Sequence, residues 1–264
     1  VVVGTIYTSM KLLKEMVTFN PAIQPAYYIQ DYEPFFSMPG SPEWQEARNS
    51  YTLIPEATLF AKTEWICNKV FDEHGVKVRK VSPSIDHDVY RPRLDAVDVN
   101  IPVISAMIRP KTPRRGAERT MRVLKGIDQA FGEDVRIEIF GCESENSLFK
   151  NLERDFSYLN HGELNRPGVA KVLQRSTCFI DLSDYQAFGR TGLEAMASNC
   201  FCVVTKFGGA DEYAVPGYNA LVVDPFDEDE VIRSVLRVLA DSQALSKLKA
   251  NSLRTASSFS INRA

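Results

Sequence analysis

A turn between residues 184 and 197 holds the residue types best suited to chemistry. Gly189 lies in the turn that follows an apolar, strand-like segment at residues 178–182, and it precedes a predicted helix whose first turn contains Arg190 and Thr191. The first amide groups of a helix lack partners within it and carry the positive end of its dipole, so they attract anions. Glu194 follows one helical turn later, where a carboxylate can accept hydrogen bonds from sugar hydroxyl groups. A capped helix with a surface glutamate would explain the glycine alone, but the whole stretch predicts a phosphate site beside a hydroxyl-binding carboxylate.

A basic loop between a predicted strand at residues 103–108 and a predicted helix at 118–131 offers a second anion site. Arg109 and Arg115 lie at its two ends, and two prolines stiffen it. Paired guanidinium groups can hold a diphosphate through fork-like hydrogen bonds. Ligands of doubly wound sheets bind at the carboxyl ends of strands, which is where this loop lies. A solvated basic loop explains these residues equally well when the loop is considered alone.

The composition narrows the class of protein. The chain has 264 residues, of which 44% are hydrophobic and 25% charged, as in ordinary globular proteins. A net charge of -3 gives no basic field that would attract a nucleic acid. No apolar run approaches the ~20 residues that span a bilayer, and no signal-peptide pattern opens the chain. We expect a protein of the cytoplasm.

The cysteines and histidines argue against disulfides and zinc. The five cysteines lack CxxC spacing, and Cys178, Cys200 and Cys202 lie in apolar segments that predict buried thiols. An odd number of cysteines without a recognisable spacing is typical of a protein from a reducing compartment. The three histidines are scattered, so a zinc site is not expected.

Strand-like and helix-like segments alternate along the whole chain, which predicts the α/β class with parallel sheets and crossover helices. A proline-bounded polar segment and the linker-like residues 94–100 interrupt this pattern. We therefore predict two domains, residues 1–95 and residues 96–264.

The stretch at 184–197 resembles the signature of GT-B glycosyltransferases of the retaining GT4 type. In that signature a Glu is followed by Phe-Gly, and a second Glu lies eight positions after the first. Here Glu194 is the second acid, but Gln186 stands at the first position. Further segments resemble the family pattern in the same order, namely residues 85–92, 139–141, 159–162, 207–212 and 217–223.

The resemblance implies two Rossmann-like, doubly wound domains facing a cleft, with a C-terminal domain that binds the nucleotide-sugar donor. It also implies that the N-terminal, acceptor-side domain is incomplete, because residues 1–95 are fewer than such a domain contains. The expected donor is a sugar linked to dTDP or UDP. The resemblance implies that the protein needs neither a metal nor another cofactor.

The resemblance also assigns roles to individual residues. The donor diphosphate would be bound by Arg109, Arg115, Gly189, Arg190 and Thr191, and the nucleoside by Gly141 and Glu194. The donor sugar would contact Gln186 and Phe188, and the acceptor side would contain Gln30, Asp31 and Glu33. Asp31 and Gln186 are the two candidates for a catalytic role.

The segment from Tyr28 to Pro34 is similar to bacterial polysaccharide rhamnosyltransferases that use dTDP-rhamnose. This similarity implies transfer of a sugar, with rhamnose as one candidate, to a growing glycan or a lipid-linked saccharide with retention of configuration. Such an acceptor would bring the protein to the inner face of the membrane. Two alternatives stay open: a non-catalytic module that binds sugar nucleotides or glycans, and a GT-B sugar-nucleotide epimerase.

Overall fold

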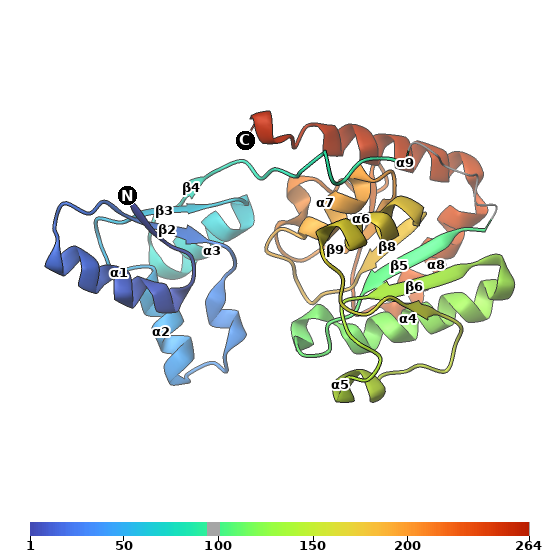
Figure 1. The fold of residues 1–264 in the computed structure, drawn as a ribbon, viewed down its shortest axis with the longest axis horizontal. Helices are drawn as coiled ribbons and strands as arrows, with labels where there is room; N and C mark the ends of the chain where they lie inside the picture. The colour runs from blue at the N-terminus through green and yellow to red at the C-terminus, as the bar shows by residue number, and fades with distance from the viewer. Residues whose placement is uncertain (94–100, 264) are drawn as a thin grey trace. The chain divides into compact units, whose positions relative to one another are not determined.

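The chain forms two compact units, Val1–Pro83 and Ser84–Arg263. The computed structural model describes residues 1–93 and 101–263. Each unit is a parallel β-sheet with helices between its strands (Figure 1), so the predicted α/β class is confirmed. The predicted boundary between residues 95 and 96, like the linker at 94–100, lies outside the described residues. Residues 84–93 make their contacts with the second unit.

The first unit has a four-stranded parallel sheet in the order β1-β2-β3-β4. Three aromatic rings fill its core, because Tyr27 and Tyr32 each stack on Tyr51 at 5.8 Å between ring centroids. Trp44 and Trp65, the two tryptophans of the chain, lie half-buried on the second and third helices. Its elements are β1 (Val2–Gly4), α1 (Tyr7–Phe19), β2 (Pro25–Ile29), α2 (Pro42–Ser50), β3 (Thr58–Ala61), α3 (Glu64–His74) and β4 (Arg79–Lys80).

The second unit has a six-stranded parallel sheet in the order β10-β9-β8-β5-β6-β7. Its strands are β5 (Val103–Met107), β6 (Arg136–Phe140), β7 (Leu159–Asn160), β8 (Cys178–Asp181), β9 (Phe201–Thr205) and β10 (Ala220–Val223). Its helices are α4 (Ala117–Phe131), α5 (Ser147–Lys150), α6 (Arg166–Arg175), α7 (Arg190–Ala197), α8 (Glu228–Ala240) and α9 (Ser242–Ser257). The chain builds outward from β5 to β7 and then returns to build from β8 to β10. The strand order therefore reverses between β5 and β8.

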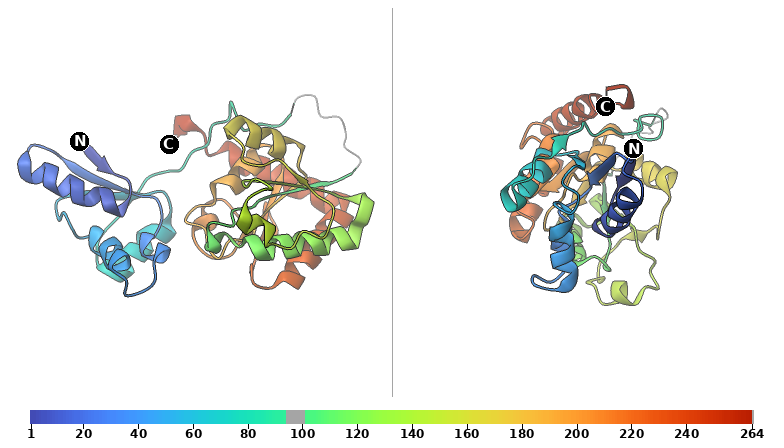
Figure 2. Two further views of the ribbon diagram at one scale, coloured as in Figure 1. Left: turned by 60° about the horizontal axis from the view of Figure 1, so that its bottom comes forward. Right: turned by 90° about the vertical axis from the view of Figure 1, so that its left-hand side faces the viewer.

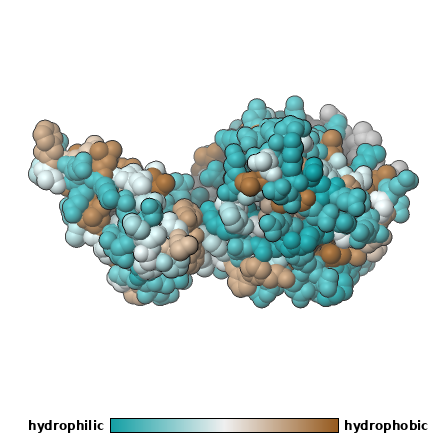
Figure 3. All heavy atoms as spheres, turned by 90° about the horizontal axis from the view of Figure 1, so that it is seen from below, coloured by the Kyte–Doolittle hydropathy of each residue, from teal (hydrophilic) through white to brown (hydrophobic). Residues whose placement is uncertain are grey.

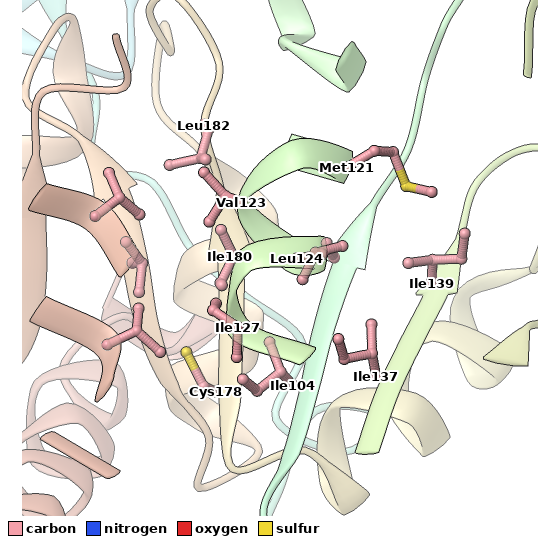
Figure 4. Packing of buried hydrophobic residues seen from close by; sticks show 14 of the residues in the cluster. Ile104, Met121, Val123, Leu124, Ile127, Ile137, Ile139, Cys178, Ile180 and Leu182 are labelled. Atoms are coloured by element: carbon pink, nitrogen blue, oxygen red, sulfur yellow. The ribbon is translucent and has the colours of Figure 1, made fainter. Parts of the chain in front are cut away.

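Two apolar clusters hold this sheet between its helices (Figure 2). On one face, α4 and α8 cover the strands, and Leu124 and Ile127 of α4 pack with Ile104 of β5 and Ile180 of β8 (Figure 4). On the other face, α6 and α7 contribute the apolar side chains. Burying one such Leu or Ile stabilises the fold by roughly 1.5–3 kcal/mol relative to exposure. This core fixes the strand ends that carry the polar loops.

Two helices of the structure are short. Helix α2 starts at Pro42, because the Ser41 side chain accepts a hydrogen bond from the Trp44 amide, and it ends at Ser50. Helix α5 ends at Lys150. Beyond it, the Asp155 amide donates to the Glu153 carboxylate rather than to a helix carbonyl.

All five cysteines are buried free thiols, which confirms the prediction for Cys178, Cys200 and Cys202. Figure 3 shows one face of the molecule, where hydrophilic residues cover most of the larger unit and hydrophobic ones lie among them on the smaller unit. In the part of the chain that the structure describes, no helix combines the length and apolar character that crossing a bilayer requires.

Candidate functional site

The two loops singled out by the sequence meet at the reversal of strand order. The basic loop follows β5, and the segment 182–189 follows β8, the strand paired with β5. The Asp184 amide donates to the Arg114 carbonyl oxygen at 2.7 Å, and Arg119 Nε donates to the Leu182 carbonyl oxygen at 2.8 Å. Arg119 also forms an ion pair with Asp184. The crevice outside such a reversal is the usual ligand site of open α/β sheets.

Gly189 sets the start of α7. It has φ 76° and ψ 50°, in the left-handed region that disfavours other residues. Its carbonyl oxygen accepts a hydrogen bond from the buried Tyr213 hydroxyl at 2.7 Å. Arg190 and Thr191 follow at the first two helical positions, where backbone amides lack intrahelical partners. The structure therefore places Gly189, Arg190 and Thr191 at the start of a helix that Tyr213 holds by a hydrogen bond, and anion binding there stays a prediction.

Gly208 and Gly209 contact the backbone just before Gly189. Gly208 has φ +99°, and a side chain there would collide with the Gln186 carbonyl oxygen. The Gly209 amide donates to that same oxygen at 2.7 Å, and the Gln186 amide donates to the Phe207 carbonyl oxygen at 3.1 Å. The Gly-Gly turn thus fixes the backbone of residue 186.

A cavity of about 20 Å³ is lined by three of the five residues that the sequence assigned to the diphosphate, and Gly189 and Arg190 are not among its lining. Arg109, Arg115 and Thr191 line it together with Asp181 and Ser183. A space of this size holds about one water molecule. The cationic side chains therefore converge on one place, but a diphosphate would enter only if they moved apart.

Gln186 is turned inward. Its Nε2 atom donates to Asp181 Oδ2 at 2.6 Å and to Ser183 Oγ at 3.0 Å, and the residue is 4% exposed. Asp181 Oδ1 in turn accepts from the Ser183 amide at 3.0 Å and from the Ser183 hydroxyl at 2.5 Å. Asp181, Ser183 and Gln186 are therefore joined in one polar network, which contains the residue that the sequence assigned to the donor sugar.

Glu194 lies in α7 with 7% of its surface exposed. Burial raises the pKa of its carboxyl group to about 7, although Arg190 and Arg166 oppose the shift. The Tyr90 hydroxyl forms a hydrogen bond with this carboxyl group. Burial first, and then the charge of Glu194, raise the pKa of Tyr90. The Glu194 carboxyl group is thus buried and partnered by a tyrosine from the segment that precedes β5, and its binding of a sugar hydroxyl stays a prediction.

Gly141 and Phe188 differ in what they offer a ligand. The Gly141 amide donates to the Gly162 carbonyl oxygen at 2.7 Å just past the end of β6, so it lies at the carboxyl edge of the sheet. Phe188 is 4% exposed, and its ring packs edge-on against Tyr213 at 5.5 Å between centroids. The structure thus places the Phe188 ring in the core rather than against a sugar.

The three acceptor-side candidates lie at or just past the end of β2 in the first unit. Gln30 is exposed and donates through Nε2 to the Thr5 carbonyl oxygen at 3.1 Å. Asp31 accepts through Oδ1 from the Tyr32 amide at 2.9 Å. Glu33 is buried, and its Oε2 atom accepts from the Tyr7 amide at 2.6 Å and from the Tyr27 hydroxyl at 3.0 Å. Glu33 therefore holds the start of α1, which leaves Gln30 and Asp31 as the accessible pair.

Sequence reasoning did not single out Asp181, Tyr90 or Tyr213 as site residues. The signal for Asp181 was present, because it is a charge at the end of an otherwise apolar strand. Tyr90 and Tyr213 reach Glu194 and Gly189 from far along the chain, so no local spacing marks them. Within residues 1–93 and 101–263, no three His, Cys, Asp or Glu side chains gather closely enough to hold a metal ion.

Solved structures share this fold. The chain superposes on sucrose-phosphate synthase from Thermosynechococcus elongatus with a TM-score of 0.77 at 14% identity, covering 97% of this chain and 68% of that one. For HepE of Anabaena, in complex with UDP and glucose, the TM-score is 0.81 at 16% identity, with 98% and 73% covered. The fold is therefore that of GT-B glycosyltransferases, with two Rossmann-like units.

Sequence comparisons point to the same group of proteins. Sucrose-phosphate synthase 1 of Arabidopsis thaliana is 25% identical over 177 residues, which are 60% of this chain but 17% of that protein. Sucrose synthase of Melioribacter roseus is 34% identical over 71 residues, or 27% of this chain and 9% of that protein. The chain thus spans under a fifth of the length of these relatives. The family model for glycosyl transferases group 1 matches residues 102–255, more than half of the chain, and the chain therefore belongs to that family.

Proposed function

We propose that this chain transfers a sugar from a nucleotide diphosphate donor to a saccharide acceptor. One observation carries the proposal: Arg109, Arg115 and Thr191 line one small cavity at the reversal of strand order in a member of the group 1 family. The diphosphate gains negative charge as its bond to the sugar breaks. Guanidinium groups and helix amides fixed around that position stabilise the developing charge.

The finer assignment follows the sequence resemblance. The enzyme would be of the retaining GT4 type, use a dTDP- or UDP-linked donor such as dTDP-rhamnose, and need no metal. The departing phosphate itself would take the proton of the acceptor hydroxyl, so no dedicated protein base is required. Glu194 would bind the hydroxyl groups of the nucleoside sugar. HepE, solved in complex with UDP and glucose, supports a nucleotide-sugar donor for this fold.

The acceptor would be a growing glycan or a lipid-linked saccharide, with Gln30 and Asp31 on its side of the site. A lipid-linked acceptor would bring the cytoplasmic protein to the inner face of the membrane. A mutant of S. aureus TarM, which has a similar fold and was solved in complex with fondaparinux, α-GlcNAc-glycerol and UDP, supports a saccharide acceptor.

Titration calorimetry with dTDP and UDP tests the diphosphate site. We expect one of the two to bind, and we expect Arg115→Ala to weaken binding by at least about tenfold, since a charged hydrogen bond contributes roughly 1.5–3 kcal/mol. Arg154→Ala, which removes an exposed arginine of the same unit outside the cavity, serves as the control. If Arg115→Ala binds dTDP or UDP as tightly as the wild type, Arg115 does not bind the diphosphate.

A non-catalytic sugar-nucleotide-binding module is the second candidate, favoured by the neutral Gln186 at the position of the first signature glutamate. A transfer assay with dTDP-rhamnose, UDP-glucose and saccharide acceptors separates the two. Donor binding with no transfer by the full-length gene product would favour the binding module.

A further inference from the structure

Arg119, the third residue of α4, contacts the segment 182–189 that follows β8, here called the β8 loop. Its Nε atom donates to the Leu182 carbonyl oxygen at 2.8 Å, and its Nη2 atom forms an ion pair with the Asp184 carboxylate. The guanidinium group also lies 4.5 Å from the centroid of the Phe226 ring. Only 12% of the Arg119 side chain is exposed. The polar contacts of this nearly buried cation are thus made to one loop.

Helix α4 by itself does not explain an arginine at this position. The first turn of a helix carries the positive end of the dipole, where a cation is unfavourable and an acid such as Glu118 is favourable. Fixing the long arginine side chain also costs rotamer freedom, and burying its charge costs free energy unless its donors are paired. The contacts of Arg119 with the β8 loop offset these costs.

Gly116 gives the Leu182 carbonyl group and Arg119 room to approach each other. Its φ is +62°, and a side chain there would collide with the Leu182 carbonyl oxygen and with the Arg119 guanidinium group. Gly116 also ends the basic loop that precedes α4. The end of the basic loop therefore packs directly against the β8 loop.

Two further contacts join the same two loops. The Asp184 amide donates to the Arg114 carbonyl oxygen at 2.7 Å. The Arg114 guanidinium group lies 5.5 Å from the centroid of the Tyr185 ring. Asp184 is therefore held twice, through its carboxylate by Arg119 and through its amide by the basic loop.

These contacts lie beside the small cavity of the proposed diphosphate site. Leu182 and Ser183 of the β8 loop line the cavity together with Arg109 and Arg115 of the basic loop. Arg109 is exposed, so its side chain can move to admit a ligand. The backbones of the two loops are tied to each other. Groups that are held in place before a ligand arrives bind it without a further ordering cost.

We propose that Arg119 is a positioning residue, which holds the β8 loop against the basic loop and thereby fixes the spacing of the groups that bind the donor diphosphate. Arg119 does not line the small cavity and acts through Leu182 and Asp184. The holding of the loop stands on the contacts alone. Its effect on the diphosphate rests on the proposed function.

Hydrogen exchange tests the holding of the loop without any ligand. Arg119→Met keeps an unbranched side chain but removes the donors, and we expect the Asp184 amide to exchange at least about tenfold faster in this variant. Arg122→Met is the matched control, because Arg122 lies one turn further along α4 and pairs with Glu228 of α8 instead. It should leave the exchange of the Asp184 amide unchanged. Equal exchange in the wild type and Arg119→Met would overturn the holding of the loop.

Calorimetry with dTDP and UDP tests the effect on the diphosphate site. We expect Arg119→Met to bind about five- to tenfold more weakly, the cost of ordering one or two side chains on binding. Arg122→Met should change the affinity by less than about twofold. Arg119→Lys should lie between the wild type and Arg119→Met, because one ammonium group lacks the fork that reaches two acceptors. Equal loss in Arg119→Met and Arg122→Met would overturn the positioning role.

A role in stability alone would give a different result. Arg119→Met would then lower the urea midpoint while the folded protein kept its affinity for the nucleotide, and this outcome would overturn the proposal. Asp184→Asn weakens the same ion pair from a side chain that is 41% exposed, so it provides the test if Arg119→Met does not fold. The double variant Arg119→Met/Asp184→Asn should bind no more weakly than Arg119→Met, since both changes remove one interaction.

The two parts of the proposal fail differently. A wild type that binds neither dTDP nor UDP would overturn the proposed function and, with it, the effect of Arg119 on the diphosphate. The exchange rate of the Asp184 amide would still decide whether Arg119 holds the β8 loop.

Discussion

The burial of the Glu194 carboxyl group can couple ligand binding to the release of a proton. With its pKa raised to about 7, half of the groups are neutral near physiological pH in the free protein. Sugar hydroxyl groups donate more strongly to a carboxylate than to a neutral carboxyl group. A nucleoside sugar bound at Glu194 would therefore release a proton from the protein.

This coupling predicts a pH-dependent affinity. The dissociation constant for UDP-glucose or dTDP-rhamnose should rise about tenfold between pH 8 and pH 6, because only about one group in ten stays ionised one unit below its pKa. These donors are suitable probes because both phosphates are esterified and do not titrate in this range. Calorimetry in buffers of different ionisation enthalpy would measure the proton release. Glu194→Gln should bind more weakly with a flat pH profile, and a wild type with that flat profile would exclude the coupling.

At this scale the sequence identified the types of groups but not their orientation. Arg109, Arg115 and Thr191 meet in one cavity because strand ends share one edge of a parallel sheet, which the strand pattern alone predicts. Whether Gln186 turns inward depends on Asp181, and whether Phe188 is buried depends on Tyr213. Such contacts arise from tertiary packing, which sequence patterns over a few neighbouring residues do not predict.

At the scale of the elements, the Gly208-Gly209 turn packs directly against the backbone of Gln186. Gly208 and Gly217 both have positive φ, at +99° and +68°. A side chain at Gly208 would meet the Gln186 backbone, whereas at Gly217 nothing lies within 4 Å. The two positions therefore separate the cost of the backbone conformation from that of a steric clash.

We expect Gly217→Ala to lower the free energy of unfolding by about 1–2 kcal/mol, the cost of a left-handed conformation. Gly208→Ala should cost clearly more and should also weaken donor binding, since it displaces Gln186. Urea unfolding and calorimetry of the two variants would measure both effects. Equal destabilisation would mean that the turn yields without disturbing residue 186.

The first residue of helix α1, Tyr7, donates its amide hydrogen bond to the buried carboxyl group of Glu33. Burial raises the pKa of Glu33 to about 7, while hydrogen bonds from the Tyr7 amide and the Tyr27 hydroxyl oppose the shift. Between pH 4.5 and 7 the folded state thus keeps a proton that the unfolded state releases. The free energy of unfolding must then fall as the pH rises through this window, by at most about 3 kcal/mol.

Glu33→Gln should remove that loss, because a glutamine oxygen can accept the same two hydrogen bonds without a charge. Relative to the wild type, the variant should become more stable between pH 5 and pH 8, by up to about 3 kcal/mol. Urea unfolding at the two pH values measures the change, with the exposed Glu56→Gln as the control. A pH-independent difference would show that Glu33 ionises as freely in the folded state as in the unfolded one.

Element boundaries were predictable where the backbone chemistry is local. The strand predicted at residues 103–108 and the helix predicted at 118–131 match β5 and α4 to within one residue at each end, because strand and helix residues act over a few positions. The ends of α2 and α5 were not predictable from periodicity, since turn contacts after Ser50 and Lys150 replace helical hydrogen bonds.

At the scale of the whole molecule, the proposed donor site belongs to one unit only. A ligand at one hundred times its dissociation constant adds about 2.7 kcal/mol to the unfolding free energy of the unit that binds it. With dTDP or UDP bound, hydrogen exchange should therefore slow in β5, β8 and α7, but not in β2 and β3 of the first unit. Equal slowing in both sheets would place part of the nucleotide site in Val1–Pro83.

The distribution of tryptophan has an optical consequence. Both indole rings, Trp44 and Trp65, belong to the first unit, so tryptophan emission reports on that unit and not on Ser84–Arg263. A fluorescence-detected melt of the wild type would miss the unfolding of Ser84–Arg263. Phe226→Trp, at an exposed ring that lies 4.5 Å from the Arg119 guanidinium, would give the second unit an emission signal of its own.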